Sequence, residues 1–292
     1  MQYEYSPETS FSEPRWEDRL KRGIWPRSNI FWLGLVFLAL STLRPWEKLV
    51  PELGEMRFEY VFSLFTIAAV AFSCKWEWRG GNIGIAVVLF VASLMVSIFT
   101  AYKPDLCSTD VNVIISAMIS FFVIVFIVRT RYQLYFFLLA YIAIMYVYVA
   151  KSEGEYFVHG AAQFRMGVKR LQGIELTFGN PNAMGAAILC SLPIACFCYS
   201  LRSEISGTWP RRYQRLLPWM LRSYFVLAVL GIFLTRSRGA AVGLVAFALM
   251  LALQSGGWVT KFRRISIALV LLLVTFFVLP SDMQGRFRTM WD

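Results

Sequence analysis

Apolar residues along this chain gather in long runs that are separated by polar and charged segments. A helix needs roughly 20 apolar residues to cross the hydrocarbon core of a bilayer. Runs of about that length, rich in Leu, Ile, Val, Phe and Ala, occur nine times. They lie near residues 28–44, 59–75, 82–101, 110–128, 132–150, 182–200, 219–234, 239–255 and 264–280. The pattern predicts an all-α, polytopic integral membrane protein with about nine transmembrane helices.

Composition supports this class. Hydrophobic residues make up 58% of the chain and charged residues 16%, against roughly 45–50% and ~25% in soluble domains. The net charge of +11 would favour nucleic acid as the partner of a soluble protein. Here the cations lie between apolar runs, where they orient a membrane protein. We therefore expect membrane lipids as partners, and no nucleic acid.

The polar segments predict an orientation. Residues 1–27 form a tail of mixed charge that is too acidic for the start of a signal peptide. With this tail in the cytoplasm, the cytoplasmic segments hold 17 of the 29 Lys and Arg residues and the outer segments hold 12. The excess agrees with the positive-inside rule. We predict a cytoplasmic tail over 1–27, a transmembrane domain over 28–280 and an outer C-terminal segment over 281–292.

A polar break divides the apolar stretch 219–255. As one helix this stretch would be about 55 Å long, which exceeds one crossing even with tilt. Thr235-Arg236-Ser237-Arg238-Gly239 lies at its middle, and each charge at the bilayer centre would cost about 2.5–3.5 kcal/mol. The sequence therefore predicts two helices joined by a tight outer turn.

One candidate binding site lies at the start of the span near 182–200. Asn180 suits an N-cap and Pro181 the first helical position, so free N–H groups and the positive end of a helix dipole face the outer surface. Arg170, ten residues upstream, is able to fold back onto Asn180 and Asn182 with Arg165 and Lys169. These residues suit a phosphate or diphosphate. The alternative is an ordinary helix start whose cations contact lipid headgroups.

A second candidate site is the break at 235–239. Ser237 suits the cap of the following helix, and Arg236 and Arg238 lie at the helix junction. Arginine grips phosphate oxygens with two parallel hydrogen bonds. The alternative is that these arginines extend along the helix end toward water.

Other ionisable residues give weaker signals. His159, Glu153, Glu155 and Glu175 share the predicted outer loop 151–181, and Glu175 lies nearest the helix start at Asn180. A histidine is a conceivable general base, although a lone loop histidine is usually just solvated. A single histidine excludes multi-histidine metal sites, and no phosphate-loop, dinucleotide or metal-ligand motif is present. We expect no cofactor and no metal.

The order of these motifs is similar to that of a known family. Arg44-Pro45-Trp46 follows the first span, Arg170 precedes Gly173 by three residues, Phe178-Gly179-Asn180-Pro181-Asn182 opens a span, and Ser237-Arg238-Gly239 comes later. This order resembles the O-antigen ligase and O-antigen polymerase-like family of bacterial inner-membrane proteins, which includes ligases found with exosortase systems. The resemblance runs from about residue 30 to the end of the chain.

The resemblance implies an activity and a site. It implies transfer of a glycan from undecaprenyl diphosphate to a glycan, lipid or protein acceptor at the periplasmic face of the inner membrane, without a metal. It gives Arg170 and Arg238, with Arg236 beside them, the role of holding the diphosphate. The reacting residue stays unknown, and ligase and polymerase are both open.

The sequence departs from the family pattern at its end. Members usually continue into a large periplasmic loop that often carries a functional histidine or arginine, and then into further spans. This chain stops at Asp292, and His159 does not match the position of the loop histidine. We expect either the N-terminal portion of a longer protein or a shortened member, and activity of this chain alone is in question.

Two other functions compete with glycan transfer. A transporter, for example of bicarbonate, should show polar residues near the bilayer midplane and broken helices in matched halves, whereas the predicted spans are apolar through their centres. A non-catalytic protein that binds anionic lipid should depend on its cytoplasmic arginines more than on Arg170 or Arg238.

Overall fold

The computed structural model describes residues 28–45, 58–73, 81–100, 114, 118, 120–165, 168–174, 178–207 and 209–253. Most of these residues are helical, which confirms the predicted helical class. The helices are α2 (Asn29–Leu43), α5 (Phe58–Ser73), α6 (Gly81–Thr100), α8 (Arg131–Val158), α9 (Pro181–Ser200), α10 (Arg202–Ser206), α11 (Arg211–Thr235) and α12 (Arg238–Leu253). Residues 120–127 are helical as well.

Three of the described helices, α8, α9 and α11, are long and apolar enough to cross a membrane. Helices α2, α5, α6 and α12 supply shorter apolar segments. The predicted span 264–280, the tail 1–27, the segment 281–292 and much of the predicted span 110–128 lie outside the described residues. A membrane protein is therefore supported, while the nine spans and their orientation stay predictions.

Two helices are longer than the predicted membrane spans that they contain. Helix α8 continues to Val158, beyond the predicted span end near residue 150, and α11 begins at Arg211, before the predicted span start near 219. Charged residues lower the hydropathy in both segments without ending the helix. In α8 the buried face continues through Ser152 and Glu153, so packing holds the helix together there.

The start of α8 shows how local sequence sets a boundary. Thr130 is its N-cap, and the Gln133 backbone N–H donates a hydrogen bond of 3.2 Å to the Thr130 hydroxyl oxygen. In return the Thr130 backbone N–H donates to the Gln133 side-chain oxygen at 3.1 Å. This reciprocal pair is a capping box, which satisfies donors that a helix start would otherwise leave open.

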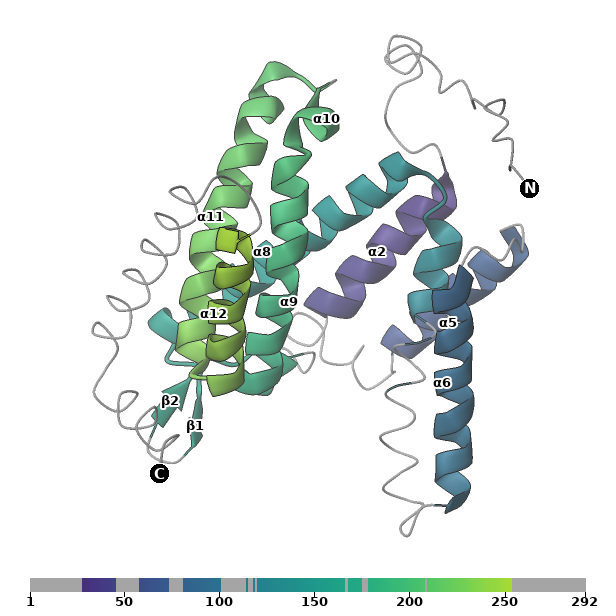
Figure 1. The fold of residues 1–292 in the computed structure, drawn as a ribbon, viewed down its shortest axis with the longest axis horizontal. Coiled ribbons are helices and arrows are strands. Elements are labelled where there is room, and N and C mark those ends of the chain that lie inside the picture. Colours follow the sequence, from purple (N-terminus) through teal and green to yellow (C-terminus); the bar gives the residue numbers. More distant parts are fainter. Residues whose placement is uncertain are drawn as a thin grey trace, which may run out of the picture.

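Helices α8, α9 and α11 form the main bundle, and α12 lies along α9 (Figure 1). Tyr148, Ile188, Leu192, Leu221 and Tyr224 are almost fully buried between them. The hydroxyls of Ser191 and Tyr224 hydrogen bond to each other inside this core, so the buried polar groups satisfy one another.

A second, smaller core joins α2, α5 and residues 120–127 to the first half of α8. Phe31 on α2 is fully buried, and Val123, Ile127 and Phe136 pack in the same cluster. The outward faces of the long helices carry exposed apolar side chains, among them Val147, Leu216 and Val226. Such large apolar surfaces are typical of contact with lipid.

The structure adds one element that the sequence did not predict. Strands β1 (Gln163–Arg165) and β2 (Val168–Arg170) form an antiparallel hairpin in which Phe164 pairs with Lys169. The hairpin lies below the start of α9 and the junction of α11 and α12 (Figure 1). The end of the bundle formed by residues 158–165, 168–174, 178–182 and 235–238 is called the hairpin end below. A hydrogen bond of 2.8 Å from the Leu171 N–H to the Leu234 carbonyl fastens the hairpin to α11.

Candidate anion-binding site at the hairpin end

Arg170 is buried where the hairpin meets the helices. It ends β2, and only 7% of its surface is exposed. Its Nε donates a hydrogen bond of 2.9 Å to the carbonyl oxygen of Thr235, and its Nη2 donates one of 2.7 Å to Oδ1 of Asn182. One guanidinium group thus connects β2 with the end of α11 and the start of α9.

The start of α9 has the predicted form. Asn180 is the N-cap and its side-chain oxygen accepts a hydrogen bond of 2.9 Å from the Asn182 backbone N–H. Pro181 occupies the first helical position, where no N–H is needed. Because Asn182 also accepts from Arg170, the helix start and the buried cation are held together.

The junction of α11 and α12 confirms the predicted break. Helix α11 ends at Thr235, and Arg236 adopts the left-handed conformation with φ of 51°. Ser237 then caps α12, because its hydroxyl oxygen accepts from the Ala240 N–H at 3.4 Å. Arg238 is the first residue of α12 and its side chain is exposed.

Close packing brings this junction against α9. A Cβ atom added at Gly185 would lie 2.9 Å from the Cβ of Ala240, 3.0 Å from Oγ1 of Thr235 and 3.2 Å from the Cβ of Ser237. Only a glycine on the second turn of α9 allows this approach. The starts of α9 and α12, each with the positive end of a helix dipole, therefore lie near each other.

Arg236 adds a buried donor to the same end. Its Nη1 is buried and has no hydrogen-bond partner among the described residues. A buried donor without an acceptor costs free energy, so its position calls for a ligand, a water or an ion. The hydrogen bonds of Arg170 to Thr235 and Asn182 bring the segments of Asn180, Asn182, Arg236 and Arg238 to the same end of the bundle. Arg170 and Arg238 lie 68 positions apart in the sequence.

Other predicted residues of this region do not join the cluster. Lys169 lies over the ring of Tyr156, with its Nζ 4.7 Å from the ring centroid. His159 is exposed, and its Nδ1 lies 2.9 Å from a carboxyl oxygen of Glu155 on the preceding turn. The side chain of Arg165 and the whole of Glu175 lie outside the described residues.

Sequence reasoning missed the burial of Glu153. The prediction put it in an outer loop, but it lies in α8 with 4% of its surface exposed. Its Oε1 and the hydroxyl of Ser152 are buried without a hydrogen-bond partner among the described residues. A Cβ atom at Gly231, one turn before Thr235, would lie 3.1 Å from that oxygen. The helical spacing of Met145, Val149 and Ser152 was the sequence signal that could have indicated a helix continuing to this point.

These groups have a clear chemical capacity. Buried and exposed arginines beside two helix starts attract and orient an anion, phosphate above all. A buried carboxyl such as that of Glu153 is able to exchange a proton with a hydroxyl that reaches it. Among the described residues, no group of three or more His, Cys, Asp and Glu could hold a metal ion, and the expectation of a metal-free site stays a prediction.

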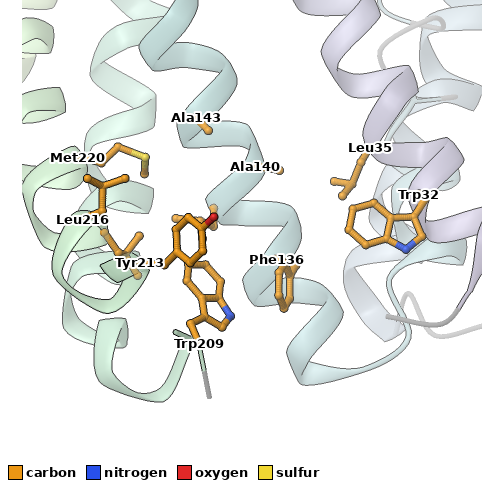
Figure 2. A pocket seen from close by; sticks show the side chains of 11 residues that line it. Trp32, Leu35, Phe136, Ala140, Ala143, Trp209, Tyr213, Leu216 and Met220 are labelled. Carbon is orange, nitrogen blue, oxygen red and sulfur yellow. The ribbon is translucent and has the colours of Figure 1, made fainter. Parts of the chain in front are cut away.

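A pocket of about 300 Å³ lies at the other end of the bundle. Figure 2 shows aromatic and aliphatic side chains around it that come from α2, α8, Trp209 and the first turns of α11. None of the residues that line it is charged. This pocket is therefore separate from the arginines of the hairpin end.

Comparisons of the chain with protein-family models, with curated proteins and with solved structures found no match. The function must therefore be argued from the residues and their arrangement.

Proposed function

We propose that the hairpin end binds the diphosphate of a lipid-linked substrate. The observation that carries this proposal is the pair of hydrogen bonds from Arg170 to Thr235 and Asn182. These hydrogen bonds hold three segments that are distant in the sequence around one positively charged group. Because the buried arginine joins two helix ends, the site is preorganised in the absence of a ligand.

Charge supports a diphosphate over a neutral headgroup. Arg236 brings a buried donor without a partner among the described residues, and Arg238 brings an exposed guanidinium on the first residue of α12. Both helix starts contribute further positive potential. Fixed cations and helix starts stabilise the negative charge that develops on a departing diphosphate, because they need no reorganisation during the reaction.

The reaction that fits such a site is transfer of a glycan away from undecaprenyl diphosphate. The motif order that resembles the O-antigen ligase and polymerase-like family supports this choice, and the diphosphate site supplies its physical basis. We place the reaction at the periplasmic face of the bacterial inner membrane, with a glycan, lipid or protein as acceptor. Arg170 holds the site together, while Arg236 and Arg238 contact the diphosphate.

Glycan transfer in membranes tests the proposal. Membranes that contain the protein receive a radiolabelled oligosaccharide on undecaprenyl diphosphate, and the label that moves to acceptor is measured. Arg238→Ala removes an exposed side chain, so the protein should insert normally and transfer should be abolished. Arg222→Ala is the matched control, because Arg222 is exposed on α11 and binds the Tyr199 hydroxyl away from the site. Unchanged transfer in both Arg236→Ala and Arg238→Ala would show that neither arginine binds the diphosphate and would contradict the proposal.

A further inference from the structure

The apolar pocket at the far end of the bundle is built between three segments. Its wall includes Trp32 and Leu35 from α2, Ala143 from α8, Trp209 just before α11, and Tyr213 in the first turn of α11. Its volume of about 300 Å³ is at the lower end of the range of small-molecule sites. The residues from 209 to 220 that line it recur at spacings of three and four, so one face of α11 forms this wall.

One polar atom of this wall has no hydrogen-bond partner in the part of the chain that the structure describes. The indole Nε1 of Trp209 is buried and has no hydrogen-bond acceptor among the described residues. Figure 2 shows the indole nitrogen turned toward the side on which Phe136 lies, and the two rings are 6.0 Å apart between centroids. An indole N–H in an apolar wall usually finds an acceptor, so the pocket suits an occupant that carries an oxygen atom.

Cations stand at the edge of the pocket. Arg212 lies over the ring of the wall residue Tyr213, with its guanidinium carbon 4.6 Å from the ring centroid. Arg211 and Arg215 are exposed in the same first turns of α11. Because α11 is long and apolar enough to cross a membrane, charged residues at its start belong at the level of the headgroups, where each contributes to attracting anionic lipid.

We propose that this pocket holds one acyl chain of an anionic phospholipid whose headgroup phosphate binds Arg212. The acyl chain fills the apolar cavity, and the ester or phosphate oxygens face the Trp209 N–H and the arginines. This lipid belongs to the leaflet opposite the hairpin end, because the pocket lies at the start of α8 and α11 and the hairpin end lies where both helices finish. The site is independent of the diphosphate site.

Native mass spectrometry of the full chain tests this proposal. The detergent-solubilised protein is mixed with equal amounts of dioleoyl-phosphatidylglycerol and dioleoyl-phosphatidylcholine, and the lipid retained during stepwise activation is identified. We expect the wild type to retain one phosphatidylglycerol preferentially. Arg212→Ala should still retain a lipid, but its preference for phosphatidylglycerol over phosphatidylcholine should fall about fivefold. Each cation near the membrane surface contributes about that factor to the binding of an anionic lipid. Arg202→Ala, at the same end but away from the pocket, should match the wild type.

A second variant fills the pocket itself. Ala143→Phe should abolish the retained lipid, whereas Ala246→Phe, an equal enlargement at an exposed position of α12, should not. Circular dichroism and size exclusion confirm that both variants fold. The proposal is overturned if the wild type shows no preference, if Arg212→Ala keeps the full preference, or if folded Ala143→Phe retains lipid like the wild type.

Discussion

Nη2 of Arg170 donates a hydrogen bond of 2.7 Å to Oδ1 of Asn182, while Nε of the same arginine donates to the carbonyl oxygen of Thr235. This bridge links the strand that precedes α9 with the first turn of α9 and the last turn of α11. The guanidinium group of Arg170 is buried inside the hairpin end, and its hydrogen bonds fix the segments around it. Arg236 and Arg238 come just after Thr235 in the chain, so their positions depend on this bridge.

Arg170→Lys tests the bridge. Lysine keeps the charge but lacks the planar fork that reaches two acceptors at once. We expect a loss of about 1.5–3 kcal/mol in the free energy of unfolding, the usual contribution of a hydrogen bond to a charged group. Asn182→Ala removes one of the two acceptors, so it should destabilise the Arg170→Lys variant less than it destabilises the wild type. Denaturation of the detergent-solubilised wild type, both single variants and the double variant measures these differences. A lysine variant as stable as the wild type would show that the bridge contributes nothing.

The close approach at Gly185 gives a second prediction. In Gly185→Ala the new methyl group meets Ala240 and Thr235 at 2.9 and 3.0 Å, so α9 and the junction must separate. We expect a loss of about 1–3 kcal/mol, the usual cost of overpacking. Gly239→Ala is the matched control, because a Cβ there would meet nothing within 4 Å. Equal thermal unfolding of the two variants would contradict the packing described here.

Glu153 provides a prediction about a buried carboxyl group. A buried carboxyl group with one oxygen unpartnered among the described residues costs stability, and more so when it is ionised. Glu153→Gln replaces it with a group of the same shape that is never charged. We expect the glutamine variant to be at least as stable as the wild type, with a gain of up to about 1 kcal/mol. Glu155→Gln, which removes an exposed contact with His159, should change stability by less than about 1 kcal/mol. A clear loss of stability in Glu153→Gln at neutral pH would contradict this expectation and show that the surroundings favour the carboxyl group.

Local sequence was sufficient for some parts of the site. Asn180 and Pro181 start a helix by their own chemistry, and Ser237 caps the next one in the same way, so both helix starts could be predicted from a few neighbouring residues. The break at Thr235 and Arg236 was predictable because charges do not belong at a bilayer centre. These features depend on residues close together in the chain.

The remaining features depend on contacts between distant segments. The bond from Arg170 to the Thr235 carbonyl joins residues 65 positions apart, and no local pattern indicates it. Glu153 looked like a loop residue because charges interrupt the hydropathy at that point, whereas the helix continues because α9 and α11 cover it. The hairpin 163–170 is anchored by Leu234, a partner that only the fold provides.

The predicted orientation can be tested without a purified protein. Alkaline phosphatase is active only outside the cytoplasm, so a fusion after residue 170 should be active and a fusion after residue 212 silent. These two positions lie at opposite ends of the bundle formed by α9 and α11. The reverse pattern of activity would put the hairpin end in the cytoplasm and would contradict a periplasmic reaction.

Binding of a prenyl diphosphate tests the central claim most directly. Isothermal calorimetry of the protein in nanodiscs compares farnesyl diphosphate with farnesol for the wild type, Arg236→Ala, Arg238→Ala and the control Arg222→Ala. We expect the wild type and Arg222→Ala to bind the diphosphate alike and farnesol weakly. Each of the other two variants should lose about tenfold or more in affinity, since a charge-assisted hydrogen bond contributes about 1.5–3 kcal/mol. Equal affinity for the diphosphate in all four proteins would contradict a diphosphate site at the hairpin end.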